Sequence, residues 1–206
     1  MRVVAAILSA LPDFAMAAVY LITWIDPNAL GDDRMVKHLV SVVLLEFIII
    51  HSSAFMGTAA ISGLSRWKKV QAILGLSVLY SIFAGAFSLA FKSWWPITAF
   101  WALTLNRLLP VLLGVVPSDR QKALIQAGWA GSACMYLIFI FLTILVPSPQ
   151  FGITPAVVEA QDLTAGSDDP GIWQTEPHRA IAFGFLYFTT IGLLELSAMR
   201  WAAAER

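Results

Sequence analysis

The stretch LLEFIIIHSSAFMG, residues 44–57, decides the fold class because it places a carboxylate and an imidazole inside an apolar run. The surrounding run from Leu39 to Ser65 contains no Asp, Lys or Arg and is long enough to cross a bilayer. A charge at the centre of a membrane helix costs about 2.5–3.5 kcal/mol on insertion scales. Glu46 and His51 therefore need a partner, water or neutralisation, which makes them candidate functional residues.

The composition of the whole chain indicates a membrane protein. Of the 206 residues, 59% are hydrophobic and 13% are charged, whereas about a quarter of the residues are charged in an ordinary soluble domain. We predict an all-α protein, a polytopic transmembrane helical bundle that forms a single transmembrane domain over residues 1–206. Its six spans are the windows that each supply roughly 20 mainly apolar residues, namely 3–25, 38–60, 70–91, 96–116, 123–146 and 179–201.

Two segments need separate interpretation. Residues 147–178 contain five prolines and three glycines, so we predict an outer loop or short interfacial segment there and no second domain. Arg2 and the apolar residues after it resemble a signal peptide, but Pro12 and Asp13 interrupt the apolar core of that segment. We therefore expect the first window to be retained as a membrane helix.

The distribution of charge predicts the orientation of the bundle. With six spans, eight Lys and Arg residues fall on the side of the termini and four on the other side. By the positive-inside rule, both termini are cytoplasmic in a multi-pass protein of the cell inner membrane. The acidic residues have the opposite asymmetry, and this charge pattern gives no support for nucleic-acid binding. The inner side holds Arg2, Arg66, Lys68, Lys69, Arg120, Lys122, Arg200, Arg206, Asp119 and Glu205, and the outer side holds Arg34, Lys37, Lys92, Arg179, Asp26, Asp32, Asp33, Glu159, Asp162, Asp168, Asp169 and Glu176.

The predicted spans contain further polar residues that are unfavourable in lipid. At 1.5 Å per residue, Asp13, Glu46 and Arg107 lie roughly 12–18 Å below the outer boundary. We expect them to form one cluster, because a guanidinium stays charged and needs carboxylate partners. His51 and Glu195 lie roughly 20–24 Å deep and form a second candidate pair. The full set of candidate site residues is Asp13, Glu46, His51, Asn106, Arg107 and Glu195.

Small residues indicate where helices approach each other closely. Ser77, Ser81 and Gly85 recur every four residues in the third window, and Gly128 and Ser132 do so in the fifth. Stripes of this kind let helix backbones pack together in membranes. We therefore expect both faces to contact other helices, either in the same chain or in another copy.

Metal and cofactor sites lack sequence support. Glu46 and His51 are five residues apart, so at 100° per residue they point about 140° away from each other. The i, i+3 and i, i+4 spacings of metal-binding helices are absent. Cys134 is the single cysteine, which excludes an intrachain disulfide and a cysteine cluster. Phosphate-binding loops and nucleophile elbows are also absent, so we predict no metal, no cofactor and no catalytic residue. A metal held by His51 with Glu195 or by His178 with Glu176, and a haem held by His38 and His178, are the alternatives that these residues leave open.

Three classes of function fit these residues. The leading hypothesis is a small channel or transporter, homo-oligomeric or part of a membrane complex, that moves protons or a small ion past the six candidate residues. The second is a non-catalytic accessory or assembly subunit of a larger membrane complex, in which the charges clamp helices together. The third is a membrane-embedded enzyme with an outward-facing site at His178 and Glu176, and the missing motifs favour it least.

Overall fold

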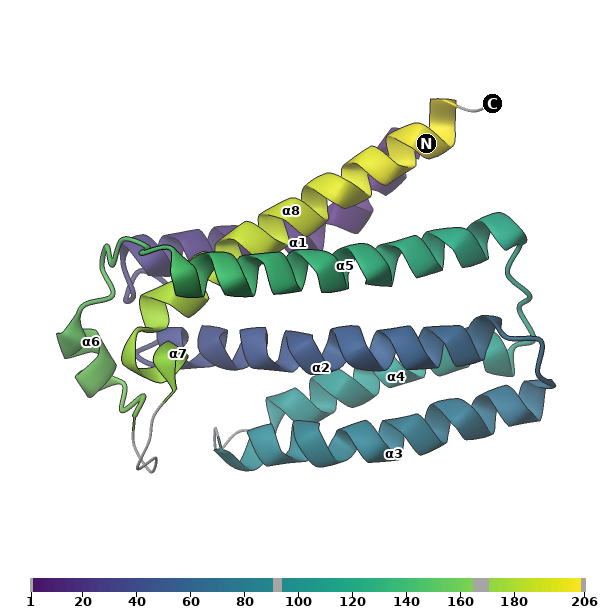
Figure 1. Cartoon of the computed structure of the whole chain (residues 1–206), viewed down its shortest axis with the longest axis horizontal. Helices are drawn as coiled ribbons and strands as arrows, with labels where there is room; N and C mark the ends of the chain where they lie inside the picture. Colours follow the sequence, from purple (N-terminus) through teal and green to yellow (C-terminus); the bar gives the residue numbers. More distant parts are fainter. Residues whose placement is uncertain (1, 91–93, 165–170, 205–206) are drawn as a thin grey trace. The chain divides into compact units, whose positions relative to one another are not determined.

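The computed structural model describes residues 2–90, 94–164 and 171–204, and this part of the chain is all-helical and has no strand (Figure 1). The prediction of an all-α protein is confirmed. Charges counted above at Lys92, Asp168, Asp169, Glu205 and Arg206 lie outside the described residues. A long helix occupies each apolar window: α1 (Arg2–Ile25), α2 (Met35–Ile61), α3 (Arg66–Ala90), α4 (Trp95–Leu112), α5 (Asp119–Leu145) and α8 (Pro177–Ala204). Two short helices, α6 (Pro155–Ala160) and α7 (Ile172–Thr175), lie in the loop between α5 and α8.

Four of the described helices are long and apolar enough to cross a membrane, which indicates a multi-pass membrane protein. They are α2, α3, α5 and the Pro177–Ser197 part of α8. Helix α4 has 18 residues, or about 27 Å of rise, and it carries Asn106 and Arg107. Helix α1 contributes a shorter apolar segment, Ala10–Ile25.

Helix α4 ends four residues before its predicted window does. Leu112 is its last residue, and Gly114 follows with a φ of +72°. The Gly114 N–H donates to the Val111 carbonyl at 3.1 Å, and a glycine in this left-handed conformation ends many helices. Pro117 comes shortly after and lacks the N–H needed to resume the helix. The fourth apolar window therefore contains a helix and the turn that ends it.

The chain divides into two compact units, which we describe separately. Unit 1 comprises Met1–Val43 and Met135–Arg206, and unit 2 comprises Leu44–Cys134. Both boundaries fall inside long helices, so α2 and α5 each contribute one part to each unit.

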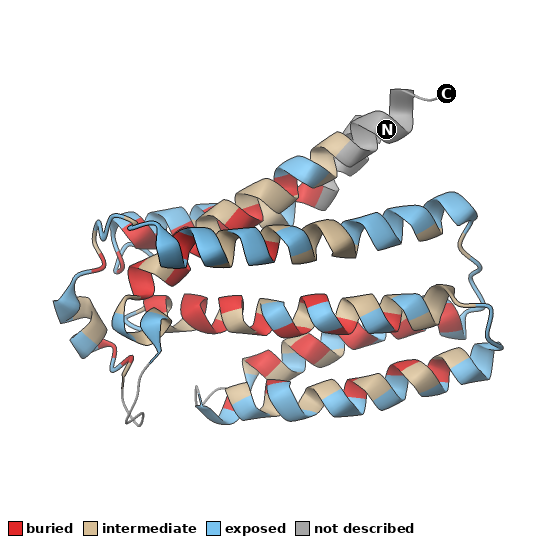
Figure 2. Ribbon diagram, viewed as in Figure 1, coloured by how far each residue is buried: buried red, intermediate tan, exposed pale blue. Residues whose placement is uncertain are grey.

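Unit 1 is built on the antiparallel pair of α1 and α8, the purple and yellow helices of Figure 1. Buried residues, many of them aromatic, form its core, and the ribbon is red at buried positions in Figure 2. Tyr20 stacks on Phe188, and the Tyr20 hydroxyl donates to the Leu39 carbonyl at 2.7 Å. The Tyr136 hydroxyl donates in the same way to the Val43 carbonyl at 2.8 Å. These two hydroxyls tie the first part of α2 and the last part of α5 to the core of unit 1.

Two glycines of α8 allow the close approach of α1. A Cβ atom at Gly184 would lie 2.2 Å from Cε1 of Tyr20, and one at Gly192 would lie 3.0 Å from Cζ of Phe14. Real Cβ atoms do not approach other atoms at the first distance, so the ring of Tyr20 occupies space that any other residue at position 184 would need. The α1–α8 pairing thus depends on a glycine at a buried aromatic contact.

The segment that follows α5 packs against the end of α1 and the start of α2. The Trp24 indole donates to the Pro149 carbonyl at 2.9 Å, and the Gly152 N–H donates to the Trp24 carbonyl at 3.0 Å. Gln161 accepts the N–H of Lys37 at 3.2 Å through its Oε1 atom. This segment is therefore held to unit 1 by backbone and side-chain hydrogen bonds.

Unit 2 has a separate core in which α3 and α4 pack together with the second part of α2. Ser77 on α3 is buried, and a Cβ atom at Gly85 would lie 3.8 Å from Ile97 of α4. The small-residue stripe of the third window therefore contacts two helices, α2 at Ser77, whose hydroxyl lies 4.0 Å from Met56 Sδ, and α4 at Gly85. The buried apolar cluster consists of Leu45, Ile48, Met56, Val70, Ile73, Ala84, Phe100, Leu108 and Val111.

Candidate functional site

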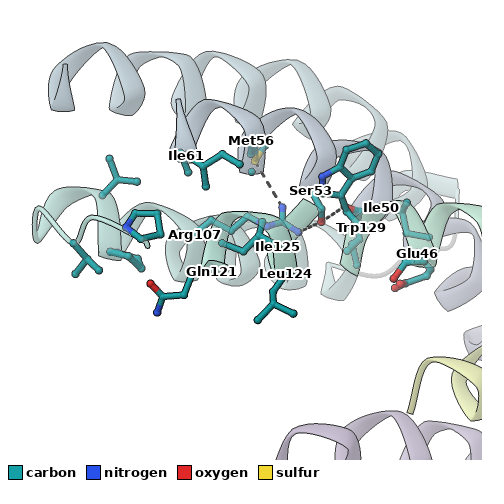
Figure 3. Close-up of a pocket in the computed structure, with 18 residues that line it drawn as sticks. Glu46, Ile50, Ser53, Met56, Ile61, Arg107, Gln121, Leu124, Ile125 and Trp129 are labelled. Atoms are coloured by element: carbon teal, nitrogen blue, oxygen red, sulfur yellow. Dashed lines mark hydrogen bonds between the residues drawn. The ribbon is translucent and has the colours of Figure 1, made fainter. Parts of the chain in front are cut away.

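A cavity of about 700 Å³ lies in unit 2 between α2, α4 and the first part of α5 (Figure 3). Its wall is mainly apolar, and the position of a Cβ atom at Gly57 lies 3.7 Å from Ile125 where α2 meets α5. Cavities of about 300–1,000 Å³ with apolar walls and a few polar groups are typical of ligand sites. The polar residues in this wall are Glu46, Ser53, Arg107, Gln121 and Ser132.

The guanidinium of Arg107 extends from α4 into this cavity and is held by α2. Its Nη1 atom donates to Ser52 Oγ at 3.3 Å and lies 3.7 Å from Met56 Sδ, a weak acceptor. Its Nη2 atom donates to Ser53 Oγ. Figure 3 shows the contacts to Ser53 and Met56 as dashed lines. All three partners are uncharged, so side-chain dipoles hold the Arg107 guanidinium in place.

The donors of Arg107 are only partly used. A guanidinium has five N–H groups, and the contacts to Ser52, Ser53 and Met56 account for three of them. Among the described residues, the other two have no hydrogen-bond acceptor. Arg107 can therefore donate to a bound group without losing its contacts to α2.

Glu46 lines the same cavity and supplies the opposite charge. It is half-buried and interacts electrostatically with Arg107. It lies two helical turns before Ser53 on α2, which is about 10 Å along the helix axis. One mainly apolar cavity thus contains a cation near its middle and a carboxylate nearer one end.

His51 and Asn106 do not line this cavity. The His51 side chain is exposed, and its Nδ1 atom lies 3.0 Å from the Phe47 carbonyl oxygen. Its ring is tilted by 45° against the Phe47 ring, with the ring centroids 4.1 Å apart. Because a carbonyl oxygen only accepts, Nδ1 carries the proton in this contact. Asn106 is also exposed on α4. The structure therefore places these two predicted site residues on other faces of their helices.

Asp13 and Glu195 lie in unit 1 and approach each other. They are half-buried on α1 and α8 and close enough to interact electrostatically. The antiparallel pairing of these helices brings them together, since the contact of Phe14 with Gly192 lies beside them. Sequence depth paired Asp13 with Glu46 and Arg107, and Glu195 with His51. Those two pairings join residues of different units and stay predictions.

A smaller cavity of about 230 Å³ in unit 1 contains the residues proposed for an outward-facing enzyme. The buried His178 ring has its Nε2 atom 3.9 Å from Glu176 Oε2. The same Glu176 oxygen accepts the Nε–H of Arg179, and Arg179 Nη1 also donates to the Thr143 and Ile144 carbonyls at 2.9 Å each. Glu176 therefore has a structural role in joining α8 to the end of α5. Within the described residues, no group of three His, Cys, Asp or Glu side chains could hold a metal ion.

Sequence reasoning missed the uncharged residues of the larger cavity. Ser53 lies seven residues after Glu46 and so shares its face of α2, a signal that does point to the cavity wall. Trp129 also lines this cavity, and its indole N–H is buried without a hydrogen-bond partner among the described residues. Comparison of the chain with protein-family models, curated proteins and solved structures finds no match.

Proposed function

We propose that this chain is a small transporter or channel of the cell inner membrane that moves protons or a small ion through the cavity of unit 2. The observation that supports this proposal is the placement of Arg107 and Glu46 in the wall of one largely apolar cavity of about 700 Å³. Ionisable groups inside membrane helices typically mark substrate and ion pathways. A helix clamp needs the charges but not a space of this size.

The proposal includes the arrangement in the membrane. Helices α1 and α4 cross the bilayer together with the four helices that are long and apolar enough to do so, which makes six spans with both termini in the cytoplasm. The end of unit 2 that contains Arg66 and Arg120 then faces the cytoplasm. A homo-oligomer, or a place among the subunits of a membrane complex, completes the proposal.

Glu46 and Arg107 are the residues that carry the function. Arg107 attracts an anion or stabilises the Glu46 carboxylate once its proton has left, because opposite charges interact strongly in an apolar cavity. The other predicted members of the pathway are Asp13, His51, Asn106 and Glu195, which rest on their depth in the sequence alone.

Flux through reconstituted protein tests the proposal. Liposomes that contain the full chain and a pH-sensitive dye are given a proton gradient, and separate samples are given gradients of small ions. We expect flux above that of empty liposomes, with a loss of about tenfold or more in Glu46→Gln and Arg107→Gln. Glu159→Gln, outside this cavity, is the matched control and keeps wild-type flux. Unchanged flux in both cavity variants would overturn the proposal.

A second candidate function has its own support. The hydrogen bonds from Arg107 to Ser52 and Ser53 join α4 to α2, as expected of a clamp in an accessory subunit. Gentle detergent extraction from native membranes distinguishes the two. A different chain that co-purifies in fixed ratio favours the accessory subunit, whereas a single-species oligomer favours the transporter.

A further inference from the structure

We infer that the cavity of unit 2 binds an amphipathic organic anion, a carboxylate with an apolar body, whose head group is bound by Arg107. This inference rests on the proposed function, because it takes the same cavity as the binding site. It goes further by naming the class of ion that binds there. It is argued from the size of the cavity, its hydrogen-bond donors and the charges around it.

The size and wall of the cavity favour an organic ligand. A volume of about 700 Å³ lies in the range of sites for small organic molecules and far exceeds a single inorganic ion. Ile49, Ile50, Val111, Leu124 and Ile125 contribute apolar surface to the wall. An apolar ligand body placed against these side chains is stabilised because its surface is removed from water.

Arg107 has unused hydrogen-bond donors in this cavity. Two of its N–H groups have no acceptor among the described residues. A guanidinium only donates, and an ionised carboxylate only accepts. Hydrogen bonds between a guanidinium and a carboxylate are also about twice as strong as those between neutral groups. The head group that fits these donors is therefore an anion.

The charge at one end of unit 2 favours the same ligand. This end of unit 2 contains the ends of α2 and α4 and the starts of α3 and α5 (Figure 1). Ile61, Pro117 and Gln121 extend the cavity wall to it. Asp119 is the acidic residue, and Lys122 pairs with it at 2.7 Å. A surplus of positive charge raises the local concentration of anions. The basic residues of this end are Arg66, Lys68, Lys69, Arg120 and Lys122.

Glu46 gives the inference a consequence that a clamp does not share. In the empty cavity, its charge partly balances Arg107 through their electrostatic interaction. A bound carboxylate at Arg107 would be repelled by Glu46, which lines the same cavity. Removal of the Glu46 charge should therefore tighten the binding of an anion at Arg107, even though it leaves the cavity wall with one charged group fewer.

A series of ligands with one tail and three head groups tests this inference. The full chain in nanodiscs of zwitterionic lipid is titrated with octanoate, octanamide and octylamine, and the heat measured with empty nanodiscs is subtracted. We expect octanoate to bind about tenfold tighter than the other two, because only its head group forms charge-assisted bonds to Arg107. In Arg107→Gln this preference is lost, and in Glu46→Gln the affinity for octanoate rises. Arg34→Gln, which removes the same charge outside the cavity wall and the basic end, changes the affinity less than about threefold.

Two other results of the head-group series would overturn the inference. Preferred binding of octylamine would make the cavity a cation site centred on Glu46, and equal binding of all three ligands would leave an apolar cavity without a head-group site. If Arg107→Gln does not fold, the head-group series on the native protein and on Glu46→Gln still decides. Octanoate binding without flux would refute transport alone, whereas proton flux without octanoate binding would refute this inference alone.

Discussion

At the scale of single residues, the sequence reveals charged side chains in apolar surroundings but not the uncharged partners that hold them. Glu46 and Arg107 stand out because charges are rare in membrane helices. Ser52 and Ser53, which bind Arg107, do not stand out, because hydroxyls are common in such helices and bond to their own backbone. His51 and Asn106 look equivalent to Glu46 in the sequence. Their exposed positions depend on which face of α2 or α4 meets a neighbour.

Asp32, before the start of α2, provides a residue-scale prediction about pH. The Arg34 N–H donates to Asp32 Oδ1 at 2.9 Å, and His38 Nδ1 lies 3.0 Å from Oδ2. The N–H of Arg34 first, and His38 in addition, hold the pKa of the Asp32 carboxyl below its ordinary value. A lowered pKa stabilises the folded state fully above the ordinary pKa, near 3.9, and this contribution is lost as the pH falls through the lowered value.

We therefore expect Asp32→Asn to flatten the pH dependence of stability below about pH 4. The effect is below about 1 kcal/mol because Asp32 is exposed. Thermal unfolding of both proteins in detergent between pH 5 and pH 2.5 measures it. Asp33→Asn changes a neighbouring carboxylate that has no hydrogen bond to described residues, so it keeps the wild-type profile. Identical profiles for wild type and Asp32→Asn would contradict the role assigned to these hydrogen bonds.

At the scale of helices, the sequence predicts which segments are helical but not which helices pack against each other. Each 20-residue apolar window contains a long helix, because backbone groups in such a segment must be satisfied internally. The predicted stripe on α3 contacts α2 at Ser77 and α4 at Gly85, but a Cβ atom at Gly128 on α5 would meet nothing within 4 Å among the described residues. The closest approach is instead at Gly184 on α8, which no periodic stripe marks. A contact between one glycine and one tyrosine ring is set by helix register, which a single window does not specify.

We expect Gly184→Ala to destabilise the protein by about 1–3 kcal/mol, because a methyl group would overlap the buried Tyr20 ring and force α1 and α8 apart. Gly128→Ala is the matched control, since its position is open and alanine improves helix propensity by up to about 1 kcal/mol. Equilibrium unfolding in a detergent–SDS mixture, followed by circular dichroism, compares the two. A Gly184→Ala protein as stable as wild type would show that α1 and α8 are not packed at this contact.

At the scale of the whole molecule, composition determines the class while the placement of the polar groups needs the structure. Depth along a helix predicts which charged residues share a level, but a level does not specify an angular position. The structure pairs the two acids Asp13 and Glu195 within unit 1 and the opposite charges Glu46 and Arg107 within unit 2. The described residues that line the cavity all belong to unit 2. The function that we propose is therefore placed in a cavity within one unit, and a polar track across the bilayer stays a prediction.

The number of spans is the whole-molecule property with the sharpest test, because α4 decides it. If only α2, α3, α5 and α8 crossed the bilayer, the ten acidic residues outside the predicted spans would divide equally between the two sides. With six spans, eight of them share the outer side. The two arrangements also differ on residues 93 and 117, which lie on opposite sides of the membrane only if α4 crosses it.

Reporter fusions at these two positions measure the difference. Alkaline phosphatase is active only outside the cytoplasm, and green fluorescent protein is fluorescent when fused on the cytoplasmic side. With six spans, we expect active phosphatase after residues 30, 93 and 165, and fluorescence after residues 63, 117 and 206. Fusions after 93 and 117 that report the same side would show that α4 does not span the membrane. Arg107 would then not need to be stabilised at membrane depth, and the argument that makes its cavity a pathway would lose its energetic basis.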